Sequence, residues 1–346
     1  MYMKGFVTRL SALALLLLFV FSTSCSLKGD PKPKNRVFYE HFETVSFLYD
    51  YTGMDSDEFN SLADSVEAAM IHYHKLFDIH QEYDGITNLA TVNKMAGAGK
   101  VKVDCAIIDL LAFSIEMYHL TNGKVNIAMG APIAIWRELG SAKAPRIPTE
   151  EELSALENHV SIDAIVIDKE EMTVEITDPL VRIDVGAIAK GYTAELIKDE
   201  LISMGKSGLV LDMGGNLCTV GSKPSGEGWI SGIRNPLYQN EGEEPYVRTV
   251  TLKNGSLVTS GGYIRYYLID GVKYHHIIDP ETFMPENRYL SVTVQVEDSG
   301  VADALSTAIF NMNPDEAEAF VCAFPNIEVT LVFPDKSVRV LSGITE

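Results

Sequence analysis

The 346-residue sequence has few cysteines, and the spacing of those it has rules out several kinds of site. Beyond the first 25 residues it contains only Cys105, Cys218 and Cys322, far apart and without a CxxC pair. That spacing does not suit a zinc site and allows at most one disulfide, so we expect buried thiols. The patterns GxGxxG and GxxxxGK[ST] are also absent, which argues against a Rossmann fingerprint and a P-loop.

Basic residues are scarce as well. The sequence carries 28 lysines and arginines against 48 acidic residues, a formal net charge of −20. A nucleic-acid surface needs clustered positive charge, so we expect no nucleic-acid partner. A phosphorylated ligand remains possible, because metal ions and backbone N–H groups can hold phosphates, and the acidic excess favours a metal partner.

Long apolar runs are missing except near the start, where residues 10–21 follow the basic Lys4 and Arg9. This run is too short to span a bilayer comfortably and is typical of an export signal. Residues 1–24 resemble a bacterial lipoprotein signal with Cys25 as the lipidated residue, although Ser22 stands where a leucine is usual. A plain secretory signal is the alternative. We expect residues 25–36 to be a tether and residues 37–346 to form the working domain.

Hydrophobic periodicity predicts an α+β domain without internal repeats. We expect a first strand over Tyr39–Tyr51 and helices over Ser56–Phe77 and Cys105–Leu120. Thr149 and Glu152 form the pattern of a capping box. Hairpins dominate the second half of the chain, so the sheets should be largely antiparallel.

The stretch 274–308 carries the first candidate chemistry, with His276 near Asp279 and, further on, Asp303 and Thr307. The last two stand four residues apart, so on a helix their side chains share one face. A carboxylate and a hydroxyl are hard oxygen donors of the kind that Mg²⁺ takes. The alternative is an ordinary solvated helix face, since many surface helices carry these residues at this offset.

A second stretch, residues 182–191, predicts a strand that turns at Gly186 into a helix ending near Met204. Free N–H groups at such a helix start suit an anion, and Lys190 near the first turn is better placed if an anion is bound there. A lysine that simply faces solvent is the alternative. Residues 123–136 are small and apolar, so they could approach a flat ligand or form a buried connection.

Taken together, the ordered motifs resemble the FAD:protein FMN transferases of the ApbE family. They are RIDVGAIAKGY at 182–192, LDMGGN at 211–216 with a glycine at 221, and TSGGYIRYY, HHIIDP and ADALSTA between 259 and 308. The stretch GKVNIAMGAPIAIW at 123–136 resembles the family's flavin-contacting segment. The likeness extends over about residues 42–320, nearly all of the expected domain.

The resemblance implies an ApbE-like (T-fold-like) α+β fold of mixed, largely antiparallel sheets with flanking helices. It also implies that FAD is the substrate, that Mg²⁺ is required, and that FMN passes to a threonine hydroxyl of another protein while AMP leaves. The implied metal ligands are the Asp303 carboxylate, the Thr307 hydroxyl and the main-chain carbonyl of Ala187. His276 becomes the candidate base and Asp279 its orienting partner.

Eight further positions match residues that bind FAD in the family: Phe42, His80, Lys124, Val125, Asn126, Asp184, Lys190 and Ile277. Three of them depart from the family pattern. Phe42 opens a Phe-Glu-Thr run where Met-Gly-Thr is usual, Asn126 replaces an aspartate, and His80 replaces a tyrosine. These changes leave the implied metal ligands intact and affect the flavin side.

By resemblance, the acceptors are subunits of the sodium-pumping NADH:quinone oxidoreductase or of the Rnf complex. We expect the protein to be exported, anchored to a bacterial membrane through Cys25 and facing the periplasm. Two alternatives stay open. One is a Mg²⁺-dependent FAD pyrophosphatase, in which water replaces the threonine, and the other is a flavin-binding lipoprotein without catalysis.

Overall fold

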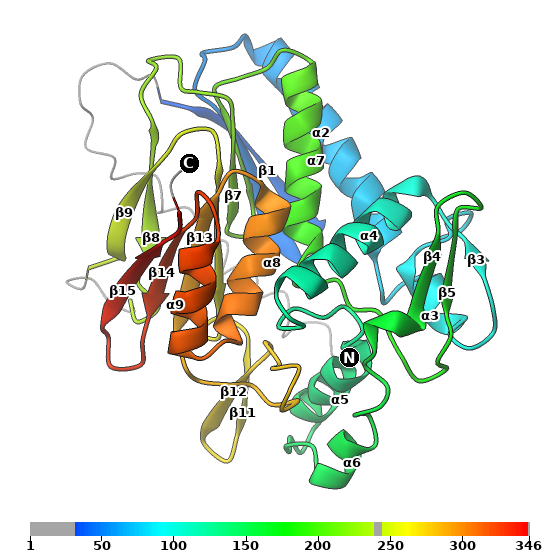
Figure 1. Cartoon of the computed structure of the whole chain (residues 1–346). Helices are drawn as coiled ribbons and strands as arrows, with labels where there is room; N and C mark the ends of the chain where they lie inside the picture. The colour runs from blue at the N-terminus through cyan, green and yellow to red at the C-terminus, as the bar shows by residue number, and fades with distance from the viewer. Residues whose placement is uncertain (1–31, 239–243, 345–346) are drawn as a thin grey trace.

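The computed structural model describes residues 32–238 and 244–344, and an antiparallel sheet of eight strands organises them (Figure 1). The predicted signal and Cys25 lie outside the described residues. In spatial order the strands are β1 (Lys34–His41), β2 (Thr44–Asp50), β6 (Leu209–Met213), β7 (Asn216–Val220), β10 (Ser256–Gly261), β13 (Ser291–Val296), β14 (Glu328–Val332) and β15 (Val338–Ser342). The first strand begins at Lys34, inside the segment that we expected to be a tether.

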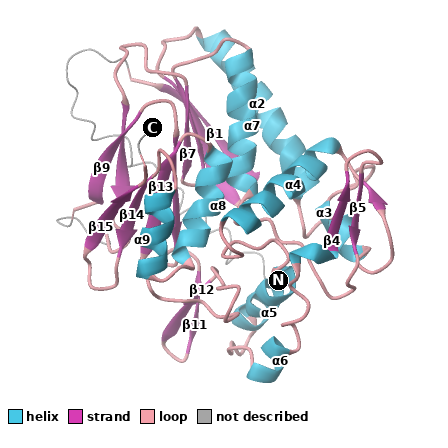
Figure 2. Cartoon of the chain, in the orientation of Figure 1, coloured by secondary structure: helices cyan, strands magenta, loops and turns pink. Residues whose placement is uncertain are grey.

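Helices cover one face of this sheet, and Figure 2 shows them gathered there. They are α2 (Ser56–Phe77), α7 (Ala189–Ser203), α8 (Ser299–Phe310) and α9 (Pro314–Ala323). Alternate residues of the strands, such as Leu48 and Leu211, pack against α2 and α7. The opposite residues, such as Phe47 and Val210, pack against a separate hairpin of β8 (Trp229–Arg234) and β9 (Tyr246–Leu252). This alternation is what a sheet buried on both faces requires.

A second group of elements packs beside the helical layer and continues the largest hydrophobic core. It contains the helices α3 (Leu89–Lys94), α4 (Cys105–Leu120), α5 (Gly130–Ser141) and α6 (Glu150–Ser154), the short 3₁₀ turn η1 (Ile162–Ala164), and a small sheet of β3 (Val101–Lys102), β5 (Thr173–Ile176) and β4 (Ile165–Asp168). The hairpin β11 (Tyr266–Ile269) and β12 (Val272–His275) contacts α5. No helix of the described residues is long and apolar enough to cross a membrane.

The α+β expectation is confirmed, and both predicted long helices have the expected bounds. The single first strand is wrong, because the chain reverses between β1 and β2. Phe42 and Glu43 occupy the left-handed region there, with φ of 52° and 53°. The expectation of buried thiols holds only for Cys218. Cys105 and Cys322 are exposed, and all three are free.

Candidate active site

The contact between helices α7 and α8 places Asp303 in a buried position beside the start of α7. Its carboxylate Oδ2 accepts the backbone N–H of Gly191 at 2.8 Å and lies 3.7 Å from Lys190 Nζ. The two helices can meet this closely because residue 191 has no side chain. A β-carbon there would lie 2.2 Å from the carbonyl oxygen of Ser299. A glycine at this point of α7 is therefore a condition for the site.

Asp303 is 4% exposed, and burial raises the pKa of its carboxyl group, while Lys190 and the Gly191 N–H oppose that shift. The Asn216 amide, like Lys190, lowers the pKa of Asp303. Its Nδ2 nevertheless has no hydrogen-bond partner among the described residues. A carboxylate in this environment favours a positive charge beside it. A bound divalent cation is a group of that kind.

Thr307 and Ala187 supply the remaining expected donors. The Thr307 hydroxyl lies 3.1 Å from Ser260 Oγ, which also lies 2.8 Å from Ser306 Oγ. In a regular helix the Gly191 N–H would bond the carbonyl of Ala187, four residues earlier, but here it bonds Asp303. Within the described ranges no hydrogen bond to the Ala187 carbonyl is found, so this oxygen is available as a ligand.

This donor set fits the metal that the sequence predicts. In the part of the chain that the structure describes, no cluster of three His, Cys, Asp or Glu side chains could hold a metal ion. One carboxylate, one hydroxyl and one main-chain carbonyl nevertheless make a hard oxygen set. Mg²⁺ binds through few protein ligands and completes its shell with water and phosphate oxygens, so a set of this size suits it.

His276 follows strand β12 directly and is oriented by a main-chain carbonyl. Its Nδ1 lies 3.1 Å from the Arg265 carbonyl, which can only accept, so Nδ1 carries the proton and Nε2 is left to act as a base. The residue remains exposed, but the protein around the imidazole lowers the pKa of His276, and the charges of Arg265 and Lys190 act in the same direction. Lys190 thus influences both the candidate base and Asp303.

Asp279 does not orient His276, contrary to our expectation. Its side chain is 1% exposed, and Oδ2 lies 3.1 Å from Arg288 Nη1 while Oδ1 accepts the Glu281 N–H at 2.8 Å. Both oxygens therefore hold the loop that follows β12. The imidazole of His276 bonds the Arg265 carbonyl instead, so proximity in sequence was a poor guide.

Asp184 and His80, far apart in the sequence, meet through Arg137 of helix α5. Asp184 Oδ1 accepts the Gly186 N–H at 2.8 Å, and Oδ2 lies 3.6 Å from Arg137 Nη2. The other terminal nitrogen of Arg137, Nη1, lies 2.9 Å from His80 Nε2. Sequence reasoning missed this arginine, although it directly follows the small-residue stretch 123–136.

Comparison with known proteins identifies the family of the chain. The sequence model of the ApbE family matches residues 43–331, which is most of the chain. The chain belongs to the ApbE family. It is 34% identical over 272 residues to a FAD:protein FMN transferase from Treponema pallidum, covering 75% of this chain and 74% of that protein. A protein of the same name from Haemophilus influenzae is 29% identical over 256 residues, covering 71% and 73%.

Solved ApbE structures agree with the fold. The crystal structure of the ApbE protein from Thermotoga maritima superposes with a TM-score of 0.79 at 25% identity, covering 90% of this chain and 97% of that one. The apo flavinyl transferase ApbE from Pseudomonas stutzeri gives a TM-score of 0.74 at 21% identity, covering 92% and 96%. The predicted α+β ApbE-like fold is confirmed.

Several of the positions for which the resemblance implied flavin binding have side chains engaged within the protein. Val125 and Ile277 are 3% and 7% exposed and belong to the main core. The Asn126 amide donates to the Val160 carbonyl at 2.9 Å and accepts the Ala128 N–H at 2.8 Å. These side chains shape the segment, and a ligand would meet mainly its backbone.

Lys124 and Phe42, two further positions of this kind, are also engaged within the protein. Lys124 Nζ lies 2.8 Å from Glu281 Oε1, on the loop that Asp279 holds. Phe42 stands in the β1–β2 turn, donates its N–H to His74 Nδ1 at 3.3 Å and packs edge-on against that imidazole.

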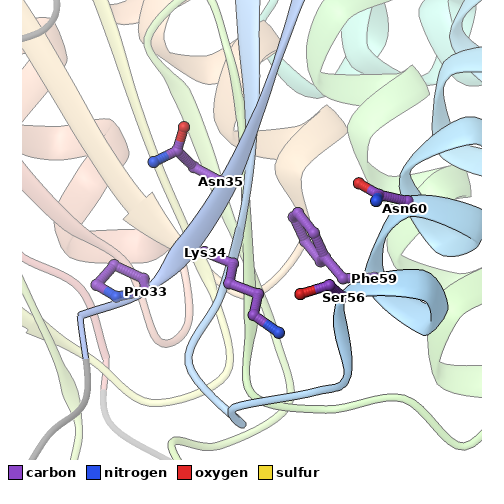
Figure 3. A pocket seen from close by; sticks show the side chains of 6 residues that line it. All are labelled: Pro33, Lys34, Asn35, Ser56, Phe59 and Asn60. Atoms are coloured by element: carbon purple, nitrogen blue, oxygen red, sulfur yellow. The ribbon is translucent and has the colours of Figure 1, made fainter.

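A surface hollow of about 370 Å³ between β1 and α2 lies apart from this site (Figure 3). It is lined by Pro33, Lys34, Asn35, Ser56, Phe59 and Asn60. None of these is a predicted site residue, and the hollow offers no carboxylate or imidazole. We assign it no part in the chemistry.

Proposed function

We propose that this protein transfers FMN from FAD to a hydroxyl group of a protein acceptor and releases AMP. The names of the Treponema and Haemophilus relatives support this activity. The observation that carries it is the buried Asp303 carboxylate, bonded by Gly191 N–H and flanked by Lys190, whose charge also acts on the candidate base His276. Such a group is costly without a ligand of opposite charge.

Asp303, Thr307 and the Ala187 carbonyl would hold Mg²⁺. When bound, this ion would neutralise the diphosphate of FAD and the negative charge that develops as AMP departs. Asp184 and Lys190 match FAD-binding positions of the family and would fix the substrate beside it. The positive charge of Lys190 already acts on both Asp303 and His276. A phosphate oxygen of the substrate would be a suitable partner for this charge.

His276 would take the proton of the acceptor. Its Nε2 is unprotonated when Nδ1 donates to the Arg265 carbonyl. The acceptor oxygen would bond the phosphorus of the FMN half, the phosphorus–oxygen bond to the AMP half would break, and the hydroxyl proton would pass to Nε2. A neutral imidazole is required at the working pH, and the lowered pKa of His276 favours that form.

Hydrolysis of FAD to FMN and AMP is the second candidate. It is favoured by the exposure of His276, because water can reach the same imidazole when no acceptor protein covers it. The two reactions use the same residues and differ in whether water is excluded.

We further propose threonine-bearing subunits of the sodium-pumping NADH:quinone oxidoreductase or of the Rnf complex as acceptors. The lipoprotein-like start supports export and a membrane anchor through Cys25. Cell fractionation tests the anchor, because Cys25→Ser should move the protein from the membrane to the soluble fraction. Persistence of that variant in the membrane would contradict it.

The activity is tested with the purified full chain, FAD and Mg²⁺, with and without a threonine-bearing acceptor domain. Covalent flavin fluorescence on a denaturing gel reports transfer, and free FMN and AMP are quantified in parallel. We expect a fluorescent acceptor band that is lost in His276→Ala and in Asp303→Ala. Release of FMN and AMP at one rate regardless of acceptor would make the protein a pyrophosphatase, and intact FAD throughout would leave only a binding protein.

A further inference from the structure

A continuous chain of hydrogen bonds joins the Phe42 turn to the loop that carries His80. The Phe42 N–H bonds His74 Nδ1 at 3.3 Å, and His74 Nε2 lies 3.3 Å from the Tyr83 hydroxyl. That hydroxyl donates to Asp78 Oδ2 at 2.7 Å, and Asp78 Oδ1 accepts the His80 N–H at 2.7 Å. The chain thus runs through the C-terminal end of α2 and ends at two of the positions where the sequence departs from the family pattern.

Only one arrangement of protons satisfies this chain. Because the Phe42 N–H can only donate, His74 Nδ1 must be an acceptor, and its proton must sit on Nε2. His74 Nε2–H then donates to the Tyr83 oxygen, which leaves the Tyr83 proton for Asp78. The chain therefore requires a neutral His74 and an ionised Asp78.

The electrostatics of the three side chains agree with this assignment. Burial lowers the pKa of His74. Burial alone would raise the pKa of Asp78, but the bonds from His80 N–H and the Tyr83 hydroxyl bring it below its usual value. Burial and the bond to Asp78 raise the pKa of Tyr83 to about 12.

Each end of the chain is tied to a residue of the candidate active site. At one end, Arg265 Nη2 donates to the Glu43 carbonyl at 2.8 Å, and the Arg265 carbonyl orients His276. At the other end, Arg137 joins His80 to Asp184. The hydrogen-bond chain therefore fixes the separation of two segments, residues 42–43 and 78–81, which Arg265 and Arg137 join to His276 and to Asp184; we call these two segments the rim of the site.

The Phe42 turn needs such an anchor. Phe42 and Glu43 both have positive φ, a conformation that costs a residue with a side chain free energy unless its surroundings enforce it. The bond to His74 holds the first of these residues at its N–H, and the bond from Arg265 holds the second at its carbonyl.

We propose that His74, with Tyr83 and Asp78, is a positioning residue that holds the rim of the site in the shape that accepts the flavin half of FAD. This inference rests on the proposed function, since it takes FAD as the ligand. His74 itself does not touch the reacting atoms. Its role is to keep the backbone at Phe42 and the loop at His80 in place.

This chain of hydrogen bonds also makes flavin binding sensitive to acid. A proton on His74 Nδ1 would face the Phe42 N–H, so two donors would meet and the anchor would be lost. The charged and titratable groups that face His74 are Asp78, Glu43, His41, Lys75 and Tyr83. Asp78 and Glu43 favour the proton, whereas His41, Lys75 and burial oppose it.

Two substitutions of the same residue separate the two bonds of His74. Asparagine places an acceptor near the position of Nδ1 and keeps the bond to Phe42, whereas glutamine reaches the position of Nε2 and keeps only the contact with Tyr83. The exposed His72, two residues earlier on α2, provides the matched control His72→Gln. Circular dichroism verifies that each variant is folded.

The experiment measures binding of FAD, FMN and ADP to the purified full chain by fluorescence and calorimetry. For His74→Gln we expect FAD and FMN to bind about tenfold more weakly, the size of one lost hydrogen bond to a partly buried donor, with ADP unchanged. His74→Asn should bind within about threefold of wild type. Wild-type affinity for FMN should fall as the solution becomes acidic, and that of His74→Asn should not.

Equal flavin affinity in wild type and His74→Gln would overturn the inference, as would a loss of equal size for ADP. These outcomes differ from a failure of the proposed function, which would appear in the wild-type protein itself, as no transfer of FMN in the activity assay or as no binding of FAD. A folded His74→Asn that binds as weakly as His74→Gln would also contradict the assigned bond to Phe42.

Discussion

The backbone N–H of Gly191 bonds the Asp303 carboxylate at 2.8 Å, in place of the helical bond to the Ala187 carbonyl. This one exchange does two things for the site. It joins the first turn of α7 to α8 close to the buried carboxylate, and it leaves the Ala187 oxygen available to a cation.

The close approach of α7 and α8 predicts that Gly191→Ala is severely destabilising. The new methyl group would lie 2.2 Å from the Ser299 carbonyl and 2.5 Å from Asp303 Cβ, so the helices must separate. We expect a loss of about 3 kcal/mol in the free energy of unfolding, measured with urea. Gly300→Ala on the facing helix is the comparison, since its methyl group would meet Tyr192 Cα, Phe113 Cζ and Asp298 Oδ1 at 3.2 Å, a milder crowding for which we expect a smaller loss. Equal losses in the two variants would argue against the tight contact at Gly191.

Asp303→Asn should separate metal binding from stability. The amide cannot supply a full negative charge, so we expect affinity for Mn²⁺, used as a paramagnetic probe for Mg²⁺, to fall by at least about 100-fold. Burial raises the pKa of Asp303, so its ionised form is held at a cost. Without metal, the free energy of unfolding should therefore not decrease. A clear decrease would show that Asp303 serves the fold rather than a cation.

The sequence predicted well those features that depend on local patterns. The bounds of Ser56–Phe77 follow from hydrophobic periodicity, and the capping box at Thr149 from two side chains three residues apart. The β1–β2 turn could not be predicted in this way, because it uses Phe42 and Glu43 in conformations that usually call for glycine. Arg182–Val185 is likewise not a strand, since the chain there follows residues 127–129 through isolated contacts.

The residues of the candidate site also divide into those that a local pattern marks and those whose partners are distant in sequence. Asp303 and Thr307 share a helix face, and a spacing of four residues is enough to predict that. Arg137 and His74 act through partners that are distant in sequence, so no local pattern marks them. Asp279 is the reverse case, near His276 in the chain but directed to Arg288 by a buried turn.

Ser260 provides a test of the support behind the metal ligands. Its hydroxyl lies 3.1 Å from that of Thr307, so Ser260→Ala should free the Thr307 side chain to rotate. We expect Mn²⁺ affinity to fall by about tenfold, as is usual when a ligand loses its supporting bond, and Ser260→Thr to recover most of it. The neighbouring Thr259 bonds Thr293 and serves as the control, Thr259→Ala. If both alanine variants bind Mn²⁺ like wild type, Ser260 does not position Thr307.

Asp279 should prove structural rather than catalytic. Removing its carboxylate in Asp279→Ala leaves Arg288 and the Glu281 N–H without their partner inside the protein. We expect the free energy of unfolding to fall by about 3 kcal/mol, the lower end for a broken buried pair because Arg288 is partly exposed. At low temperature the turnover of FAD should stay within about threefold of wild type. A stable variant with a much lower turnover would instead restore the orienting role that proximity to His276 suggested.

The lowered pKa of His74 also predicts how the stability of the protein depends on pH. The ordinary histidine pKa is 6.5, and burial places that of His74 below it. Above the ordinary value both folded and unfolded chains carry a neutral imidazole, so the residue adds no pH dependence. As the pH falls through the ordinary value, the unfolded protein binds a proton at His74 while the folded protein does not, so the folded state loses stability until the pH has also passed the folded pKa.

We expect His74→Asn to flatten this part of the profile of unfolding free energy against pH, measured with urea between pH 7 and pH 5, about the range in which a histidine titrates. His72→Gln should leave the profile unchanged, because that side chain is exposed. A profile of the same slope in His74→Asn and wild type would mean that His74 takes up a proton equally readily in the folded and unfolded protein, which contradicts a bond from Phe42 that favours the neutral imidazole.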